Sequence, residues 1–139
     1  MIRFSMKKIA VEQFAILVNE YPRTEITLNT DLTFQYSLES RQVACKVAFR
    51  FCADDSVCLV LVCKCDFLIA EDDWRRLVKG NGIAIPKSLM EILAVHTIGT
   101  ARGILFCKTE GTPFNAMMIP PINVEKMMES EPAEIESGN

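Results

Sequence analysis

The sequence predicts an α+β fold in one domain, because its strand patterns come first and its helix patterns come last. Apolar and polar residues alternate over residues 32–38 and 43–69, which is the spacing of half-buried strands. Beyond residue 70, apolar residues recur every three or four positions, as in amphipathic helices. The length of 139 residues fits one domain, and the hydrophobic share of 50% is enough for a sizeable core.

The N-terminal part predicts two or three extended segments. A first strand, or by periodicity equally a short helix, is expected over residues 9–20, and Tyr21-Pro22-Arg23 ends it. A short alternating stretch over residues 25–29 then precedes the strand over residues 32–38. We favour a strand for the first segment, so that only residues 21–23 separate it from the next one.

The start of the chain resembles a signal peptide but lacks two of its features. Glu12 and Gln13 interrupt the apolar run, and no small-residue cleavage site follows it. No run in the sequence is long enough to cross a bilayer. We therefore expect a cytoplasmic protein without membrane insertion, whose six cysteines stay reduced.

A long hairpin over residues 42–69 is the clearest feature of the sequence. One face of its first strand is apolar, and residues 53–56 have the composition of a turn. Centring this turn on Asp54 predicts that Cys45 lies opposite Cys63. The second strand is apolar on both faces near its start, so we expect a helix, another sheet or another chain to cover both faces there.

The remaining elements are helical. A short helix is expected over residues 71–79, with acidic residues at its start and basic residues toward its end. A longer helix begins at Pro86, and residues 114–119 are expected to be extended. Asn123 is a good N-cap for a last helix over residues 124–130. The domain thus covers residues 1–130, and the acidic tail 131–139 is expected to be disordered.

No group of residues suggests catalysis, and we expect neither an enzyme nor a cofactor. His96 is the only histidine, and a single histidine without a partner is most simply a packed residue at the edge of the core. The Cys63-x-Cys65 pair with Cys45 lies on strands, which cannot wrap a metal ion, so no metal site is expected. A net charge of −3 gives no reason to expect nucleic-acid binding.

The C-terminal third resembles the SecB family of protein-export chaperones. The resemblance rests on short segments in a fixed order: Ile85-Pro86 before the long helix, Ala101-Arg102-Gly103 at its close, Thr112-Pro113-Phe114, and Ile119-Pro120-Pro121-Ile122-Asn123-Val124. It implies an antiparallel four-stranded sheet with helices packed on one side. It also implies a homo-oligomer, a dimer or tetramer, that holds unfolded polypeptide clients in apolar grooves without ATP, with protein export as the process that the family serves.

Two departures from the family pattern affect these expectations. The short connection at residues 21–23 leaves little chain to form a groove wall. The family docks the translocation motor ATPase through an acidic residue on the third strand, whereas residues 58–62 are apolar here. The sequence therefore gives little support to coupling with the motor. A dedicated adaptor, or an antitoxin-associated chaperone with one protein partner, is the alternative.

The residues predicted to contact a polypeptide lie near the link between the hairpin and the long helix. Trp74, the only tryptophan, is either an anchor for a partner or a lid on the core. The methionines near the C-terminus suit either an adaptable binding surface or the filling of gaps in a core. The predicted contact residues are Phe67, Ile69, Trp74, Leu77, Ile83 and Ile85. A small-molecule or enzymatic domain remains a third hypothesis, which requires an enclosed pocket around His96 or Trp74.

Overall fold

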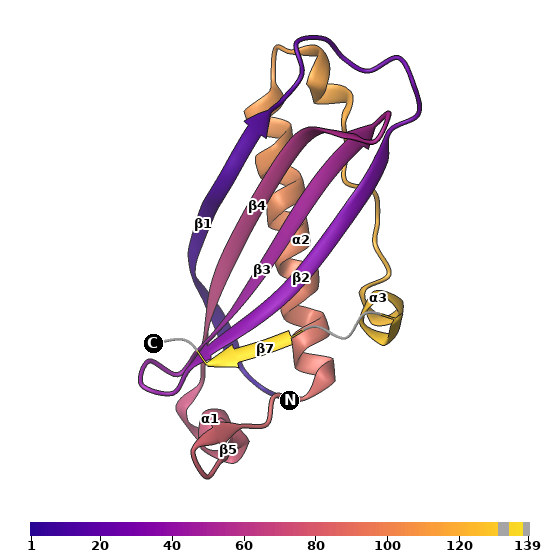
Figure 1. Cartoon of the computed structure of the whole chain (residues 1–139). Helices are drawn as coiled ribbons and strands as arrows, with labels where there is room; N and C mark the ends of the chain where they lie inside the picture. The colour runs from indigo at the N-terminus through magenta and orange to yellow at the C-terminus, as the bar shows by residue number, and fades with distance from the viewer. Residues whose placement is uncertain (131–133, 138–139) are drawn as a thin grey trace.

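The computed structural model, which describes residues 1–130 and 134–137, is an α+β fold built on one long antiparallel sheet (Figure 1). Its four long strands are β1 (Phe4–Ile16), β2 (Thr27–Ser37), β3 (Gln42–Ala53) and β4 (Ser56–Ile69). They lie in the order β1-β4-β3-β2, and every neighbouring pair is antiparallel. The predicted fold class is confirmed.

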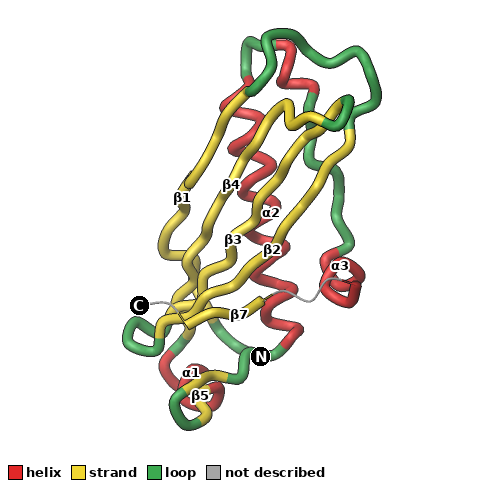
Figure 2. Tube along the Cα trace, viewed as in Figure 1, coloured by secondary structure: helices red, strands yellow, loops and turns green. Residues whose placement is uncertain are grey.

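The helices follow the sheet in sequence, and the longest crosses one of its faces (Figures 1 and 2). The elements are α1 (Glu71–Leu77), the small hairpin β5 (Val78–Lys79) and β6 (Gly82–Ile83), α2 (Lys87–Thr109), the 3-10 turn η1 (Pro113–Ala116) and α3 (Val124–Ser130). Pro86 is the N-cap of α2, as its fixed φ favours. Asn123 caps α3, because its Oδ1 accepts a hydrogen bond from the Lys126 N–H at 3.0 Å. Residues 114–119, predicted to be extended, begin instead inside η1.

The N-terminal strands differ from the prediction in their limits. The first strand starts at Phe4 and ends at Ile16, and the segments 25–29 and 32–38 merge into the single strand β2. The connection between β1 and β2 therefore covers residues 17–26 rather than residues 21–23. The prediction of a three-residue connection was wrong, because the alternation does not show where pairing to β4 stops.

The predicted register of the β3–β4 hairpin was also wrong. Cys45 lies opposite Cys65, and Cys63 lies opposite Val47. The turn consists of Asp54 and Asp55, both at positive φ (52° and 62°), as two-residue hairpin turns require. A β-bulge then inserts Cys58 between the pairs Cys52↔Val57 and Phe51↔Leu59. Together they shift the pairing by two residues, which keeps the side chains from Leu59 onward on their predicted faces. Before the bulge the prediction was wrong, because Val57 lies on the outer face and Cys58 in the core.

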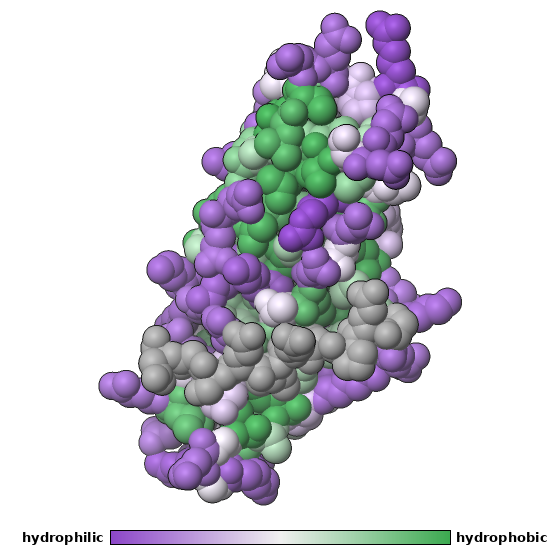
Figure 3. Space-filling view, in the orientation of Figure 1, coloured by the Kyte–Doolittle hydropathy of each residue, from purple (hydrophilic) through white to green (hydrophobic). Residues whose placement is uncertain are grey.

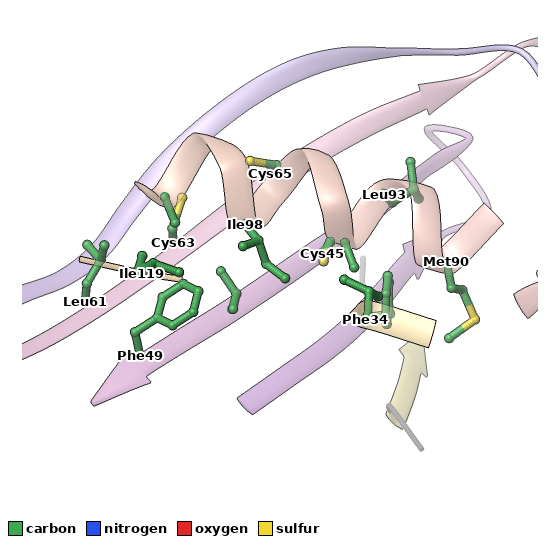
Figure 4. Close-up of a cluster of buried hydrophobic side chains, with 14 of the residues drawn as sticks. Phe34, Cys45, Phe49, Leu61, Cys63, Cys65, Met90, Leu93, Ile98 and Ile119 are labelled. Carbon is green, nitrogen blue, oxygen red and sulfur yellow. The ribbon is translucent and has the colours of Figure 1, made fainter. Parts of the chain in front are cut away.

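The core lies between the sheet and the inner side of α2. Figure 4 shows side chains from β2, β3 and β4 under the helix, closed at one end by Ile119. Phe34, Phe49 and Leu93 are fully buried. The two glycines of α2 are exposed and do not break the helix, because the burial of its inner side chains offsets the low helix propensity of glycine.

No helix in the described part of the chain covers the other face of the sheet, which faces the viewer in Figure 3. Ala48, Val60 and Val62 form a small apolar cluster there and are nevertheless 6–9% exposed. Two ion pairs lie on the same side: Lys46 Nζ to Glu12 at 2.9 Å, and Arg50 Nη1 to Asp31 at 2.6 Å. Neighbouring side chains thus shield this cluster, although Figure 3 shows a green apolar surface on the same face. Coverage of the face by another chain stays a prediction.

The acidic tail was predicted to be disordered from residue 131. Within it, Glu134–Ser137 form the strand β7, which pairs in parallel with the free edge of β2. Residues 131–133 and 138–139 lie outside the described residues. The difference at 134–137 has a backbone cause, because an open sheet edge pairs with a segment whatever its composition.

Candidate functional site

An apolar groove lies at the end of the sheet where the β1–β2 connection meets the segment after η1. Its volume is about 290 Å³. It is lined by Tyr21 and Ile26 of the connection, Leu28 of β2, Phe51 of β3, and Ala116, Met117, Met118 and Pro120. In Figures 1 and 2 these segments gather at the upper end of the molecule.

Hydrogen bonds fix the β1–β2 connection as one wall of the groove. The Leu17 N–H donates to the Cys58 carbonyl at 2.7 Å, and the Thr24 hydroxyl donates to the Asp54 carboxylate at 3.1 Å. The Tyr21 ring lies 5.9 Å from the Phe114 ring, centroid to centroid. The connection is therefore held to the β3–β4 turn on one side and to η1 on the other.

The opposite wall is the segment 116–120, and Arg102 of α2 holds it in place. The guanidinium donates to the Ile119 carbonyl from Nε at 2.7 Å and to the Pro120 carbonyl from Nη2 at 2.9 Å. Met117 and Ile119 point inward and are 3% and 1% exposed, whereas Met118 between them is 57% exposed. Arg102, which belongs to the Ala101-Arg102-Gly103 segment, thus positions the exposed methionine at the groove.

The lining of the groove suits binding rather than catalysis. Seven of the eight lining residues have apolar side chains, and the phenol of Tyr21 is the one ionisable group among them. Its side chains are aromatic, aliphatic and thioether groups, and methionine adapts its shape to different apolar partners. The groove can therefore receive apolar side chains of varied form.

The predicted contact residues lie elsewhere, at the opposite end of the sheet. Phe67 and Ile69 are fully buried, and Trp74 and Leu77 are 5% and 8% exposed. The N-terminus and α1 close over them: the Arg3 N–H donates to the Asp73 carboxylate at 2.9 Å, and Arg3 Nε lies 3.2 Å from the same oxygen. These four residues already pack in the core of the chain, so they offer a partner little surface in this fold, and their contact role stays a prediction.

Ile83 and Ile85 are half-buried and pack against the same core, so their contact role stays a prediction. The groove residues were missed because they come from four segments that are far apart in sequence. The only signal that pointed to them was the pair Met117-Met118, for which core and binding roles were both open.

His96 is exposed on α2 and packs against aromatic rings. Its ring lies 5.8 Å from Phe4 and 6.4 Å from Phe67, centroid to centroid. Beside it, an open groove of about 420 Å³ runs between α2 and the start of α3, lined mainly by apolar atoms of residues such as Ile92 and Val95. This groove is not the enclosed pocket that the enzymatic hypothesis requires.

The strand cysteines form a buried thiol group. Burial raises the pKa of the Cys45 thiol to about 12, although a hydrogen bond with Thr97 acts in the opposite direction. A hydrogen bond with Cys65, together with burial, raises the pKa of Cys63. All six cysteines are free thiols, and no set of three potential ligands among the described residues could hold a metal ion. Cys45 and Cys63 thus stay protonated, as packed core thiols do, whereas the hydrogen bond with Cys63 lowers the pKa of Cys65.

The side of α2 that faces away from the sheet carries a second apolar surface, which we call the outer stripe. It consists of Ile92, Val95, Gly99, Gly103 and Phe106, spaced three or four residues apart. Its three large side chains are 43%, 57% and 49% exposed. A Cβ atom added at either glycine would meet nothing within 4 Å, so neither glycine serves packing inside the chain.

Helix α2 is also long and apolar enough to span a membrane by length and composition alone, although 44% of the relevant window is buried in the fold. Its inner side packs on the sheet, as in the core helix of a folded domain. This is the only helix of that kind in the part of the chain that the structure describes.

The fold defined by this sheet and helix is that of SecB-like proteins. A SecB-like chaperone of Mycobacterium tuberculosis, solved with a ChAD peptide from the HigA1 antitoxin, superposes with a TM-score of 0.56 over 87% of this chain and 88% of that chain, at 11% identity. A protein of unknown function from Streptococcus agalactiae gives a TM-score of 0.47 at 11% identity, over 88% and 98% of the two chains. No protein-family model and no curated protein matches the sequence. The resemblance predicted from sequence is thus confirmed at the level of the fold.

Proposed function

We propose that this chain is an ATP-independent chaperone of SecB-like fold that binds unfolded polypeptide segments. The observation that carries the proposal is the apolar groove between the β1–β2 connection and residues 116–120, because it exposes apolar side chains between two fixed walls. A SecB-like chaperone with this fold binds an antitoxin peptide, which supports a polypeptide as the ligand. We propose no enzymatic activity and no cofactor.

Met118 gives the sharpest test of this proposal, because it lines the groove, is 57% exposed and adds little to the core. We expect Met118→Glu to weaken binding of an unfolded client about tenfold, since a carboxylate without a partner in an apolar contact costs roughly 1–3 kcal/mol. Met118→Leu keeps the apolar volume and should bind like the parent protein. The assay is suppression of aggregation of a chemically denatured enzyme, together with titration of a fluorescent unfolded client.

Leu38→Glu is the matched control, because it introduces the same charge at an exposed apolar residue of the β2–β3 turn, at the other end of the sheet. Equal weakening by Met118→Glu and Leu38→Glu would mean that net charge, not the groove, controls binding. A parent protein that leaves the aggregation of several clients unchanged would refute the proposal as a whole.

The second candidate is a dedicated adaptor or antitoxin-associated chaperone that binds one partner. The structural neighbour with a peptide from one antitoxin favours it. Both functions use the same groove, so they differ in the number of ligands. The two functions are separated by capturing bound proteins from the native cell, once with the parent protein and once with Met118→Glu as bait. Many partners that depend on Met118 indicate a general chaperone, and one dominant partner that depends on Met118 indicates an adaptor.

The outer stripe of α2 supports self-association as part of the same proposal. Two glycines flanked by large apolar residues allow another helix to approach closely, and a stripe that faces water on a monomer is costly. A homo-oligomer, a dimer or tetramer, would cover it. We place the protein in the cytoplasm, without nucleic acid or membrane as a partner, and we do not include a translocation motor among its partners.

A further inference from the structure

The free edge of β2 lacks the features that protect the free edge of β1. On β1, bulges insert the charged residues Lys7 and Glu12, which interrupt a regular edge. By contrast, β2 pairs with β3 residue by residue over its full length without a bulge, and Asp31 is its only charged residue. A regular edge strand with few charges presents N–H and C=O groups to any extended chain that reaches it.

A segment of the chain itself already uses part of this edge. Glu134 to Ser137 run parallel to β2, with Thr33 opposite Glu134 and Tyr36 opposite Ser137. Residues 27–32 of the same edge have no strand partner among the described residues. The edge of β2 therefore accepts an added parallel strand, and its unpaired residues 27–32 leave room for a strand longer than 134–137.

The edge is continuous with the apolar groove. Ile26 and Leu28, which line the groove, lie on either side of Thr27, the first residue of β2. A polypeptide that leaves the groove at this point lies directly beside the unpaired residues 27–32. Farther along it meets the positions that 134–137 occupy.

We propose that the free edge of β2 is a strand-addition site at which an extended segment of an unfolded partner polypeptide pairs parallel to β2, and that residues 134–137 occupy part of this site until the partner displaces them. The partner class rests on the proposed function. Pairing through backbone groups tolerates many sequences, because every residue except proline offers the same donor and acceptor. The groove then supplies apolar contacts, and the edge supplies contacts that do not depend on sequence.

A client can pair with the edge only in molecules whose C-terminal segment has left it. The observed affinity is therefore the intrinsic affinity multiplied by the fraction of molecules whose edge is free. A chain that ends at Ser130 should therefore bind a client more tightly than the full chain. The probe is reduced, alkylated and permanently unfolded α-lactalbumin, titrated by fluorescence. We expect its dissociation constant to fall about three- to tenfold on truncation, which corresponds to an edge that is occupied most of the time.

Truncation also removes three glutamates, and the probe is acidic, so charge needs its own control. The full-length variant Glu131→Gln, Glu134→Gln, Glu136→Gln removes the same charges and keeps the segment. We expect it to bind the probe like the parent chain. Amide hydrogen exchange supplies the second readout: the probe should protect residues 27–32 of β2, and truncation without the probe should speed exchange at residues 33–36.

Three results would overturn the strand-addition site: unchanged affinity after truncation, the same tightening in the glutamine variant, or no added protection of β2 by the probe. In each case, loss of binding in Met118→Glu would leave the proposed function intact, because that variant tests the groove alone. A truncated chain that pairs with its own copy, seen as a larger mass with β2 protected and no probe present, would also overturn it.

Discussion

Replacing Phe106 by alanine tests whether the outer stripe of α2 joins two copies of this chain. Phe106 is 49% exposed on the helix side opposite the sheet, so its loss removes little from the core of one chain. A phenylalanine side chain has about 150–250 Å² to bury, so roughly 100 Å² of it faces solvent here. Gly99 and Gly103, two turns or less away, leave room for a second helix.

The expected effect follows from symmetry. In a two-fold interface each substitution counts twice. Alanine would retain part of the contact, so the pair loses on the order of 110 Å² of apolar burial, or roughly 2.7 kcal/mol at 25 cal/mol per Å². That energy corresponds to an increase of about 100-fold in the dissociation constant of the oligomer.

Sedimentation velocity over a wide range of protein concentrations measures this shift. We expect the parent chain to sediment as a dimer or tetramer, and Phe106→Ala to dissociate at concentrations where the parent chain does not. Met118→Ala removes an exposed apolar side chain from the groove instead, and it should leave the mass unchanged. A parent chain that is monomeric at every concentration, or an equal effect of the two substitutions, would refute the assignment of the stripe to self-association.

Three further predictions concern the fold itself. Phe49→Ala should lower the melting temperature by about 10 °C, because emptying a fully buried phenylalanine site costs roughly 3–5 kcal/mol in a domain of this size. A shift as small as that of a variant at an exposed site would contradict the packing under α2. The backbone N–H and the guanidinium of Arg3 lower the pKa of Asp73 in the folded chain. This contact therefore stabilises the fold fully above the pKa of an unfolded carboxyl, about 4, and the stabilisation is lost as the pH falls through the lower pKa of the folded state. Asp73→Asn should therefore melt earlier than the parent at pH 7 and differ less from it in acid, as followed by calorimetry. Iodoacetamide should modify the exposed Cys107 quickly and Cys45 only after unfolding, because burial raises the pKa of Cys45 to about 12; mass spectrometry of the labelled peptides checks this.

The sheet could be predicted from sequence because its signal is local. Alternation assigned the faces of β3, and of β4 from Leu59 onward, correctly, and the register error preserved them because the shift was an even number of residues. The bulge at Cys58 left no signal, since cysteine is compatible with either face of a strand. The limits of α1 and the start of α2 were predicted within a turn by the glycines after residue 79 and by Pro86. The end of α2 was not, because the helix continues past Ala101-Arg102-Gly103 to Thr109.

The candidate site could not be predicted because no local pattern joins its parts. Tyr21, Leu28 and Met118 meet only after the sheet has formed and α2 has crossed it. The choice of Trp74 instead followed from the preference of tryptophan for interfaces. That preference does not distinguish a partner chain from the chain's own N-terminus, which closes over α1 through Arg3. Exposure, which separates Met118 from its buried neighbours, is a property of the folded chain.

The groove, the free edge of β2 and the outer stripe of α2 lie on different parts of the molecule, and this separation allows one chain to associate with itself and still bind a client. The stripe lies on the side of α2 that faces away from the sheet, whereas the groove opens at the end of the sheet beside β2. Self-association through the stripe therefore covers neither Met118 nor the backbone groups of residues 27–32.

An oligomer built this way would present one groove and one edge per chain, and a long unfolded polypeptide could contact several of them. Binding to a longer client should then strengthen more steeply than binding to a short one, because each further contact is intramolecular. Phe106→Ala should remove that length dependence while it leaves the affinity for a short peptide unchanged. If the dependence persists in a monomeric variant, the client makes its additional contacts within one chain.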